Sequence, residues 1–299
     1  MDLTVALSTY NRAHLLGRVL EALFAQDYDP QRYEIVLIND GSSDGTHDLI
    51  ERLRPQAPCR FDVVHQENAG LAKGRNVAVG RAAGEFILFI DDDILATPVL
   101  VGEHMAMHGE HPRAIVRGAV LNVESFDELP PPIWSIKNYS GNYFWTSNVS
   151  LPRALFDEVG LFNESFSEYG WEDLEIGLRL RHAGVPSLFN PRAVVYHYKP
   201  RPTAHNVAGM VRQARAQART ARQFRALNPH WRVKLATGQT TPHVLLHRAL
   251  RSARYMRTLL TVLGTVRDES APLSPLQLAA ARALAREAYF EELEHATPR

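Results

Sequence analysis

The sequence is poor in several features that define common classes of protein. It has one cysteine, Cys59, which excludes an intramolecular disulfide and a zinc site built from cysteines. It contains no run of about 18 apolar residues, so it offers no obvious membrane span. Its first residues lack the basic region and the long apolar core of a signal peptide. We therefore expect a cytoplasmic protein.

The chain also lacks an excess of charge of either sign. Its 33 Lys and Arg residues balance its 33 Asp and Glu residues. A protein without a basic surplus has no long-range field that attracts nucleic acid, so nucleic acid is not an expected partner. The remaining composition, 45% hydrophobic and 22% charged, is that of a globular protein.

The first 93 residues alternate short apolar runs with segments of helical periodicity. Apolar strands are expected at residues 3–8, 35–38, 61–65 and 86–90. Helices are expected between them, at residues 15–26, 46–53 and 72–83. This alternation predicts an α/β fold with parallel strands and with helices on both faces of the sheet. Polar clusters follow the strands, and open α/β sheets bind ligands beyond the carboxyl ends of their strands.

Three groups of residues after these strands could carry chemistry. The carboxylates of Asp91, Asp92 and Asp93 repel one another, and a divalent cation that bridges them to a diphosphate would neutralise them; a solvated acidic turn is the alternative. Glu172 and Asp173 are expected at a helix N-terminus, where the dipole favours anions. Such a carboxylate suits a general base, although simple charge complementarity explains it equally well. The imidazole of His197 is either structural or a nitrogen ligand for a metal.

Five segments, taken in order, resemble glycosyltransferase family 2, the inverting enzymes with the GT-A fold. They are residues 8–12, 39–46, 68–76, 91–93 and 171–175, and residues 146–153 with 159–164 also fit. The resemblance covers about residues 2–200. It implies a mostly parallel nucleotide-binding sheet flanked by helices. Residues 1–204 would form the catalytic domain, with a nucleotide-binding half at 1–93 and an acceptor half at 94–204, and residues 205–299 a helical C-terminal extension.

The resemblance implies a role for each matching residue. Those expected to border the nucleotide are Thr9, Tyr10, Asn11, Arg12, Asp40, Asn68, Gly70, Lys73, Arg75, Asp91 and Asp92, with Asp40 on the base. Those expected to face the donor sugar or the acceptor are Trp145, Ser147, Asn148 and Trp171. Asp91, Asp93 and His197 would bind Mn²⁺ or Mg²⁺. Asp173 would be the general base, and Glu172 would contact acceptor hydroxyls.

The implied function is inverting transfer of a sugar from a nucleotide sugar, with UDP as the expected nucleotide. The acceptor would be a sugar, a lipid-linked molecule or a small molecule. A sugar nucleotidyltransferase is an alternative, but it would need a Gly-rich basic loop after the first strand, and residues 8–12 contain no glycine. A non-catalytic module that binds nucleotide sugars or polysaccharides is another, although it would not need Asp173 beside an intact acidic triplet.

Two segments allow a functional and a structural interpretation. The aromatic residues of loop 122–145 could close over an acceptor or pack beneath the loop. Helices are expected at about residues 205–227, 242–266 and 274–295, and the first two are rich in arginine. A basic amphipathic helix can lie on the inner face of a membrane, which would suit a lipid-linked acceptor. We favour a helical cap with solvated arginines, since such faces are common on soluble helices.

Overall fold

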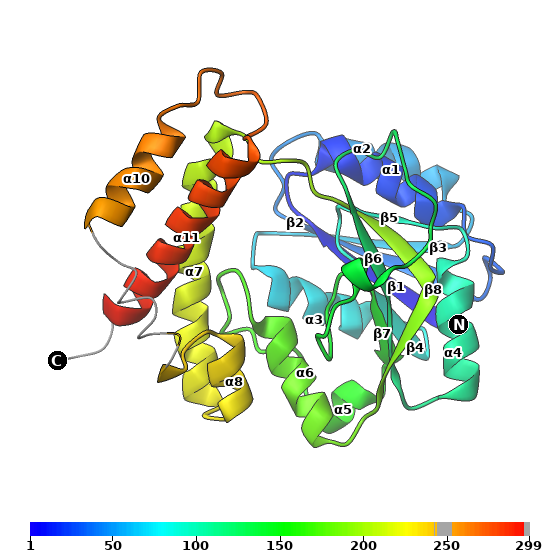
Figure 1. Cartoon of the computed structure of the whole chain (residues 1–299). Helices are drawn as coiled ribbons and strands as arrows, with labels where there is room; N and C mark the ends of the chain where they lie inside the picture. Colours follow the sequence, from blue (N-terminus) through cyan, green and yellow to red (C-terminus); the bar gives the residue numbers. More distant parts are fainter. Residues whose placement is uncertain (242, 244–252, 296–299) are drawn as a thin grey trace. The chain divides into compact units, whose positions relative to one another are not determined.

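The computed structural model describes residues 1–241, 243 and 253–295, which form two compact units (Figure 1). The sheet unit comprises Met1–Ser167 and Glu172–Pro200. The helical unit comprises Glu168–Trp171 and Arg201–Arg299. The chain therefore leaves the sheet unit for four residues and returns to it at Glu172.

The sheet unit contains a mixed, mostly parallel sheet with the strand order β3-β2-β1-β4-β7-β6-β8-β5. The strands β1 (Leu3–Thr9), β2 (Tyr33–Asp40), β3 (Arg60–Gln66) and β4 (Phe86–Phe89) are parallel, as predicted. Next to them, β7 (Val149–Pro152) runs antiparallel to both β4 and β6 (Ile115–Val123). The strand β8 (Ser187–Tyr198) is parallel to β6 and antiparallel to β5 (Ile94–Ala96).

Helices cover both faces of this sheet because its strands are apolar on both sides (Figure 1). One apolar core contains residues of α1 (Ala13–Phe24), α2 (Thr46–Leu53) and α4 (Leu100–Glu110). The other contains residues of α3 (Leu71–Arg81), α5 (Leu155–Val159) and α6 (Glu172–His182). The predicted α/β class, with its sheet between helices, is confirmed.

The helical unit contains α7 (Ala204–Leu227), α8 (Trp231–Ala236), α10 (Ala253–Leu263) and α11 (Pro275–His295). The predicted helices 205–227 and 274–295 agree with α7 and α11, so the helical extension is confirmed. The predicted helix 242–266 includes residues 242 and 244–252, which lie outside the described residues. Within the described part of the chain, no helix is long and apolar enough to span a membrane.

Arginines of α7 form ion pairs with α11, which lies beside α7 in Figure 1. Arg219 and Arg222 lie 3.5 and 3.8 Å from the carboxylate of Glu292, and Arg215 lies 3.5 Å from that of Glu291. Three of the arginines in this segment are therefore paired with carboxylates of a neighbouring helix.

A chain of buried polar groups joins α4 to the centre of the sheet. The imidazole of His104 contacts Ser150 through Nδ1 at 2.7 Å and Asn148 Oδ1 through Nε2 at 2.9 Å. His108 Nε2 lies 2.7 Å from the same Ser150 hydroxyl. The Asn148 amide donates to the carbonyls of Ala119 and Ala193. Burial lowers the pKa of His104 to about 4 and that of His108 to about 3, so both are neutral at pH 7.

This network predicts a loss of stability in acid. Because the folded pKa of His104 lies below its unfolded value, the unfolded chain binds more protons below about pH 6.5, and the free energy of unfolding falls as the pH drops. Between pH 7 and pH 5 the wild-type protein should lose about 2 kcal/mol more than the variant His104→Gln. Urea unfolding at the two pH values measures this difference.

The control is His47→Gln, which alters a histidine on α2 whose side chain is 56% exposed. It should keep the wild-type dependence on pH. If the stability of His104→Gln depends on pH as that of the wild type does, the claim that His104 is buried in its neutral form is wrong.

Candidate functional site

Asn11 connects the loops that follow β1 and β2. Its backbone has a φ of +53°, in the left-handed region that asparagine tolerates. Its carboxamide oxygen accepts hydrogen bonds from the backbone N–H of Ser43 at 2.8 Å and of Asp44 at 3.3 Å. This side chain therefore shapes the loops. Of its neighbours, Thr9 is buried and Tyr10 is 51% exposed, and their expected contacts with a nucleotide stay predictions.

Asp40, at the end of β2, organises the turn that begins α3. Its carboxylate accepts hydrogen bonds from Gln66 Nε2 at 2.7 Å and from the backbone N–H groups of Ala69 at 2.9 Å and Gly70 at 3.0 Å. Gly70 has a φ of +87°, which favours glycine at this position. A carboxylate has about four acceptor positions, so one is left for a base N–H.

Two further residues expected near the nucleotide, Asn68 and Lys73, lie on the surface around the start of α3. Both side chains are exposed. Within the described part of the chain, neither side chain makes a hydrogen bond or an ion pair with the acidic triplet, and their expected roles also stay predictions.

The acidic triplet follows β4 and is only partly balanced by positive charge. Asp91 accepts a hydrogen bond from the Ser147 hydroxyl at 2.6 Å and lies 3.7 Å from Arg75. Arg12 lies 3.8 Å from Asp92 and 4.0 Å from Asp93. Burial raises the pKa of Asp92 to about 7, against the opposing effects of Thr9 and Arg12. A further cation near this turn would favour the ionised form of these carboxylates.

Asp93 and His197 are the two predicted metal ligands that the structure brings together. Strand pairing places Ile94 opposite His197, and His197 Nε2 lies 3.5 Å from Asp93 Oδ1. Both side chains are less than 20% exposed, at 15% for His197 and 18% for Asp93. Asp93 Oδ1 has no hydrogen-bond partner among the described residues. Adjacent ligands of a divalent ion with bonds of ~2.1 Å lie about 3 Å apart, so this pair fits such an ion.

The fit is that of a partial metal site. Among residues 1–241, 243 and 253–295, no group of three His, Cys, Asp or Glu side chains could hold an ion. The carboxylate of Asp91, the third predicted ligand, already contacts Ser147 and Arg75.

Arg75 is buried and joins three segments of the site. Its guanidinium donates hydrogen bonds to Glu172 Oε1 and to Thr146 Oγ1, each at 2.7 Å, and lies 3.7 Å from Asp91. Its side chain is only 9% exposed. Neighbouring carboxylates raise its pKa despite the opposing effect of burial. Arg75 thus joins the acidic loop after β4 to the start of α6, and its expected contact with a nucleotide stays a prediction.

The two acidic residues at the start of α6 have different environments. Glu172 is 5% exposed and bound to Arg75, and its Oε2 has no hydrogen-bond partner in the described part of the chain. Asp173 is partly exposed. Burial and the charge of Glu172 raise the pKa of Asp173 to about 7, with Arg75 opposing them. Asp173 therefore combines access from solvent with a proton affinity suited to a base at neutral pH.

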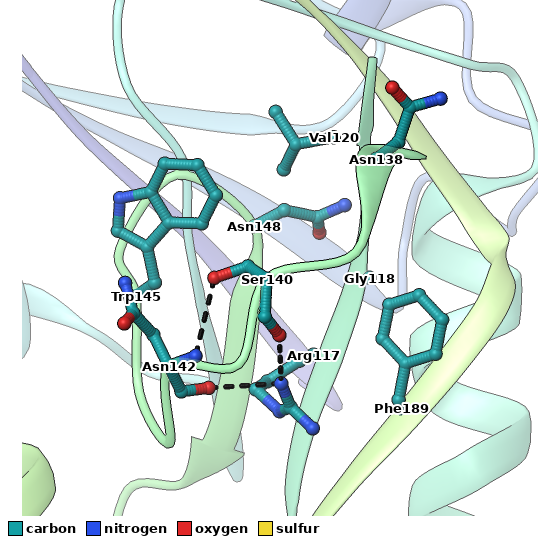
Figure 2. A pocket seen from close by; sticks show the side chains of 9 residues that line it. All are labelled: Arg117, Gly118, Val120, Asn138, Ser140, Asn142, Trp145, Asn148 and Phe189. Atoms are coloured by element: carbon teal, nitrogen blue, oxygen red, sulfur yellow. Dashed lines mark hydrogen bonds between the residues drawn. The ribbon is translucent and has the colours of Figure 1, made fainter. Parts of the chain in front are cut away.

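A small pocket lies between the long loop and strands β6 and β8 (Figure 2). Arg117, on β6, donates hydrogen bonds to the carbonyls of Ser140 and Asn142, each at 2.9 Å. Its guanidinium also lies 5.9 Å from the ring of Tyr139 and 5.8 Å from that of Phe189. Arg117 thus holds the loop against the sheet. The sequence analysis did not single it out, although an arginine in an apolar strand was a signal.

Two of the residues predicted to face a sugar, Trp145 and Asn148, line this pocket (Figure 2). The side-chain amide of Asn148 makes hydrogen bonds in the buried network with His104, which gives it a structural role. Among the loop aromatics, Phe144 is buried in the core, and Tyr143 donates to the carbonyl of Val185. These two pack beneath the loop.

Trp171 belongs to the helical unit, where its side chain is 9% exposed. Its indole N–H donates to the carbonyl of Gln217 at 2.8 Å, and its ring stacks on Phe224. The expected role of Trp171 as a platform for a sugar ring stays a prediction.

Comparisons with known proteins find similar sequences and similar folds. The family model described as glycosyl transferase family 2 matches residues 4–157. Validoxylamine A glucosyltransferase of Streptomyces hygroscopicus subsp. limoneus is 32% identical over 222 residues, which cover 62% of this chain and 49% of that protein. The chain thus spans about half the length of this relative and of the validoxylamine A glucosyltransferase of Streptomyces hygroscopicus subsp. jinggangensis.

Two solved structures share the fold. One is Staphylococcus aureus TarS 1–349 in complex with UDP, with a TM-score of 0.58 and 20% identity over 98% of this chain and 90% of that one. The other is the mannosyltransferase PcManGT of Pyrobaculum calidifontis in complex with GDP-Man and Mn²⁺, with a TM-score of 0.64 and 18% identity over 99% and 88% of the two chains. At these identities the likeness concerns the fold.

Proposed function

Because the chain belongs to glycosyl transferase family 2, we propose that it transfers a sugar from a nucleotide sugar to an acceptor hydroxyl with inversion. The resemblance seen in the sequence and the expected GT-A fold are both confirmed by the comparisons. A sugar nucleotidyltransferase, the first alternative, is a different family. The second, a binding module without catalysis, gives no reason for a partly exposed Asp173 with a raised pKa beside the acidic triplet.

The observation that carries the proposal is the position of Arg75. This one side chain donates to Glu172, next to Asp173, and lies 3.7 Å from Asp91, two residues from Asp93. The expected base and the expected diphosphate site therefore belong to one connected set of polar groups. UDP is the proposed nucleotide, supported by the UDP bound to TarS, while the GDP-Man bound to PcManGT shows that the fold also accepts guanine.

The proposed reaction is a single displacement. Asp173 accepts the proton of an acceptor hydroxyl, and the hydroxyl oxygen forms a bond to the anomeric carbon. The bond from that carbon to the diphosphate oxygen breaks, and its electron pair leaves with the diphosphate. Attack from the face opposite the leaving group inverts the anomeric configuration.

Asp93 and His197 would hold a divalent ion, Mn²⁺ or Mg²⁺, which would stabilise the charge on the departing diphosphate. The buried Oδ1 of Asp93, which lacks a hydrogen-bond partner in the described part of the chain, supports this assignment. The nature of the acceptor, and contact with a membrane through the helical unit, stay predictions from the sequence.

The first test is the variant Asp173→Asn, which removes the base with little change in shape. Turnover, measured as UDP release in the presence of a productive acceptor, should fall at least ~10²-fold, the usual contribution of general base catalysis. UDP binding in the presence of Mn²⁺ should be unchanged. The matched control is Asp157→Asn, an exposed aspartate of α5. Turnover near the wild-type rate in Asp173→Asn would exclude Asp173 as the base.

The second test addresses the metal ligands. A ligand that binds only the folded state raises the melting temperature, so UDP with Mn²⁺ should stabilise the wild-type protein more than UDP alone. We expect Asp93→Asn and His197→Gln to lose the additional shift caused by Mn²⁺, and Asp157→Asn to keep it. A full Mn²⁺ effect in both ligand variants would show that the ion binds elsewhere.

A further inference from the structure

Residues 168–171 immediately precede the helix that carries Asp173 and belong to the helical unit. Two consecutive residues of this segment have left-handed backbone conformations, with φ of +101° at Gly170 and +77° at Trp171. For a tryptophan this conformation costs about 1–2 kcal/mol and persists only where surrounding contacts enforce it. The backbone of this turn is therefore held by the contacts around it.

Helix α7 supplies these contacts. The Trp171 indole N–H donates to the Gln217 carbonyl at 2.8 Å, and its ring stacks on Phe224 with centroids 6.2 Å apart. The Thr220 hydroxyl lies 3.1 Å from the carbonyl oxygen of Tyr169, and equally 3.1 Å from the carbonyl oxygens of Ala216 and Gln217 in its own helix. Residues 217, 220 and 224 recur at intervals of three and four, so they lie on one face of the helix.

An ion pair adds to these contacts between α7 and residues 168–171. Arg219 donates a hydrogen bond to Glu168 at 2.8 Å and also lies 3.5 Å from Glu292 of α11. An added Cβ at Gly170 would lie 3.2 Å from the side chain of Gln217, so the turn lies directly against α7. Residues 168, 169 and 171 of the segment thus each contact α7.

We propose that Trp171 and Thr220 are positioning residues for the reaction. Through them α7 holds residues 168–171, the segment that is joined directly along the chain to Glu172 and Asp173. This inference rests on the proposed role of Asp173 as the base. It assigns a role in turnover to the helical unit, all of which lies beyond the residues that the family model matches.

Two conservative variants of the full chain test the proposal. Trp171→Phe keeps an aromatic ring and removes the indole N–H, and Thr220→Val keeps the volume and removes the hydroxyl. A displacement of about 1 Å in a catalytic group can lower turnover ~10²-fold. We expect kcat to fall at least tenfold in each variant, with the KM for the donor and the Kd for UDP within twofold of the wild-type values.

The matched control is Thr237→Val. This threonine is also buried in the helical unit, at 2% exposure, and its hydroxyl donates to the Val233 carbonyl of α8, with no acceptor in residues 168–171. It should keep the wild-type kcat. The proposal is overturned if Trp171→Phe and Thr220→Val turn over within twofold of the wild type. It is equally overturned if Thr237→Val loses as much kcat, or if UDP binding weakens in parallel with kcat.

A readout that does not depend on turnover separates this inference from the proposed function. Hydrogen exchange of the backbone amides of residues 172–176 should be faster in Trp171→Phe and Thr220→Val than in the wild type and in Thr237→Val. Unchanged exchange would overturn the positioning role even if Asp173→Asn is inactive. Faster exchange together with an active Asp173→Asn would support the effect of Trp171 and Thr220 on the start of α6. It would contradict the assignment of Asp173 as the base.

Discussion

The candidate site depends on one buried cation. Arg75 extends from α3 and donates to Glu172 and Thr146, with Asp91 3.7 Å away. A buried charge is tolerable only with partners, and removing one partner of such a pair leaves the other uncompensated. The acidic loop after β4 and the first turn of α6 are therefore held in one arrangement. Residues that are far apart in the sequence can then act on the same molecule.

The acidic residues of this site differ in how far their carboxylate oxygens are already used in contacts within the protein. Asp91 is occupied by Ser147 and lies near Arg75, whereas Asp93 Oδ1 has no hydrogen-bond partner in the described part of the chain and faces His197. Asp173 is partly exposed, with a pKa raised by burial and by Glu172. We therefore propose that Asp93 and His197 would hold the ion that stabilises the leaving diphosphate, and that Asp173 accepts the proton of the attacking hydroxyl. In this proposal electrostatic stabilisation and proton transfer would act at opposite sides of the anomeric carbon.

Local patterns predicted the strands and helices of the first half, because uniformly apolar runs and helical periodicity report burial directly. The motif order also predicted which polar residues lie near the sheet edge. It could not predict which of these residues make hydrogen bonds and ion pairs within the protein. Asn11 and Asn148 are engaged in internal hydrogen bonds, and Arg75 is buried. The burial of Trp171 depends on α7, more than 40 residues away in the sequence, and on a left-handed backbone that few tryptophans adopt.

The central claim is that the Arg75–Glu172 pair holds the site together, and a double-mutant cycle of unfolding free energies tests it most directly. The account predicts that Arg75→Met lowers the free energy of unfolding by about 3–5 kcal/mol, because Glu172 is left buried and unpaired. Adding Glu172→Gln should then cost much less than it does in the wild-type background. Costs that add within about 0.5 kcal/mol would show that the two residues act independently and would contradict the account.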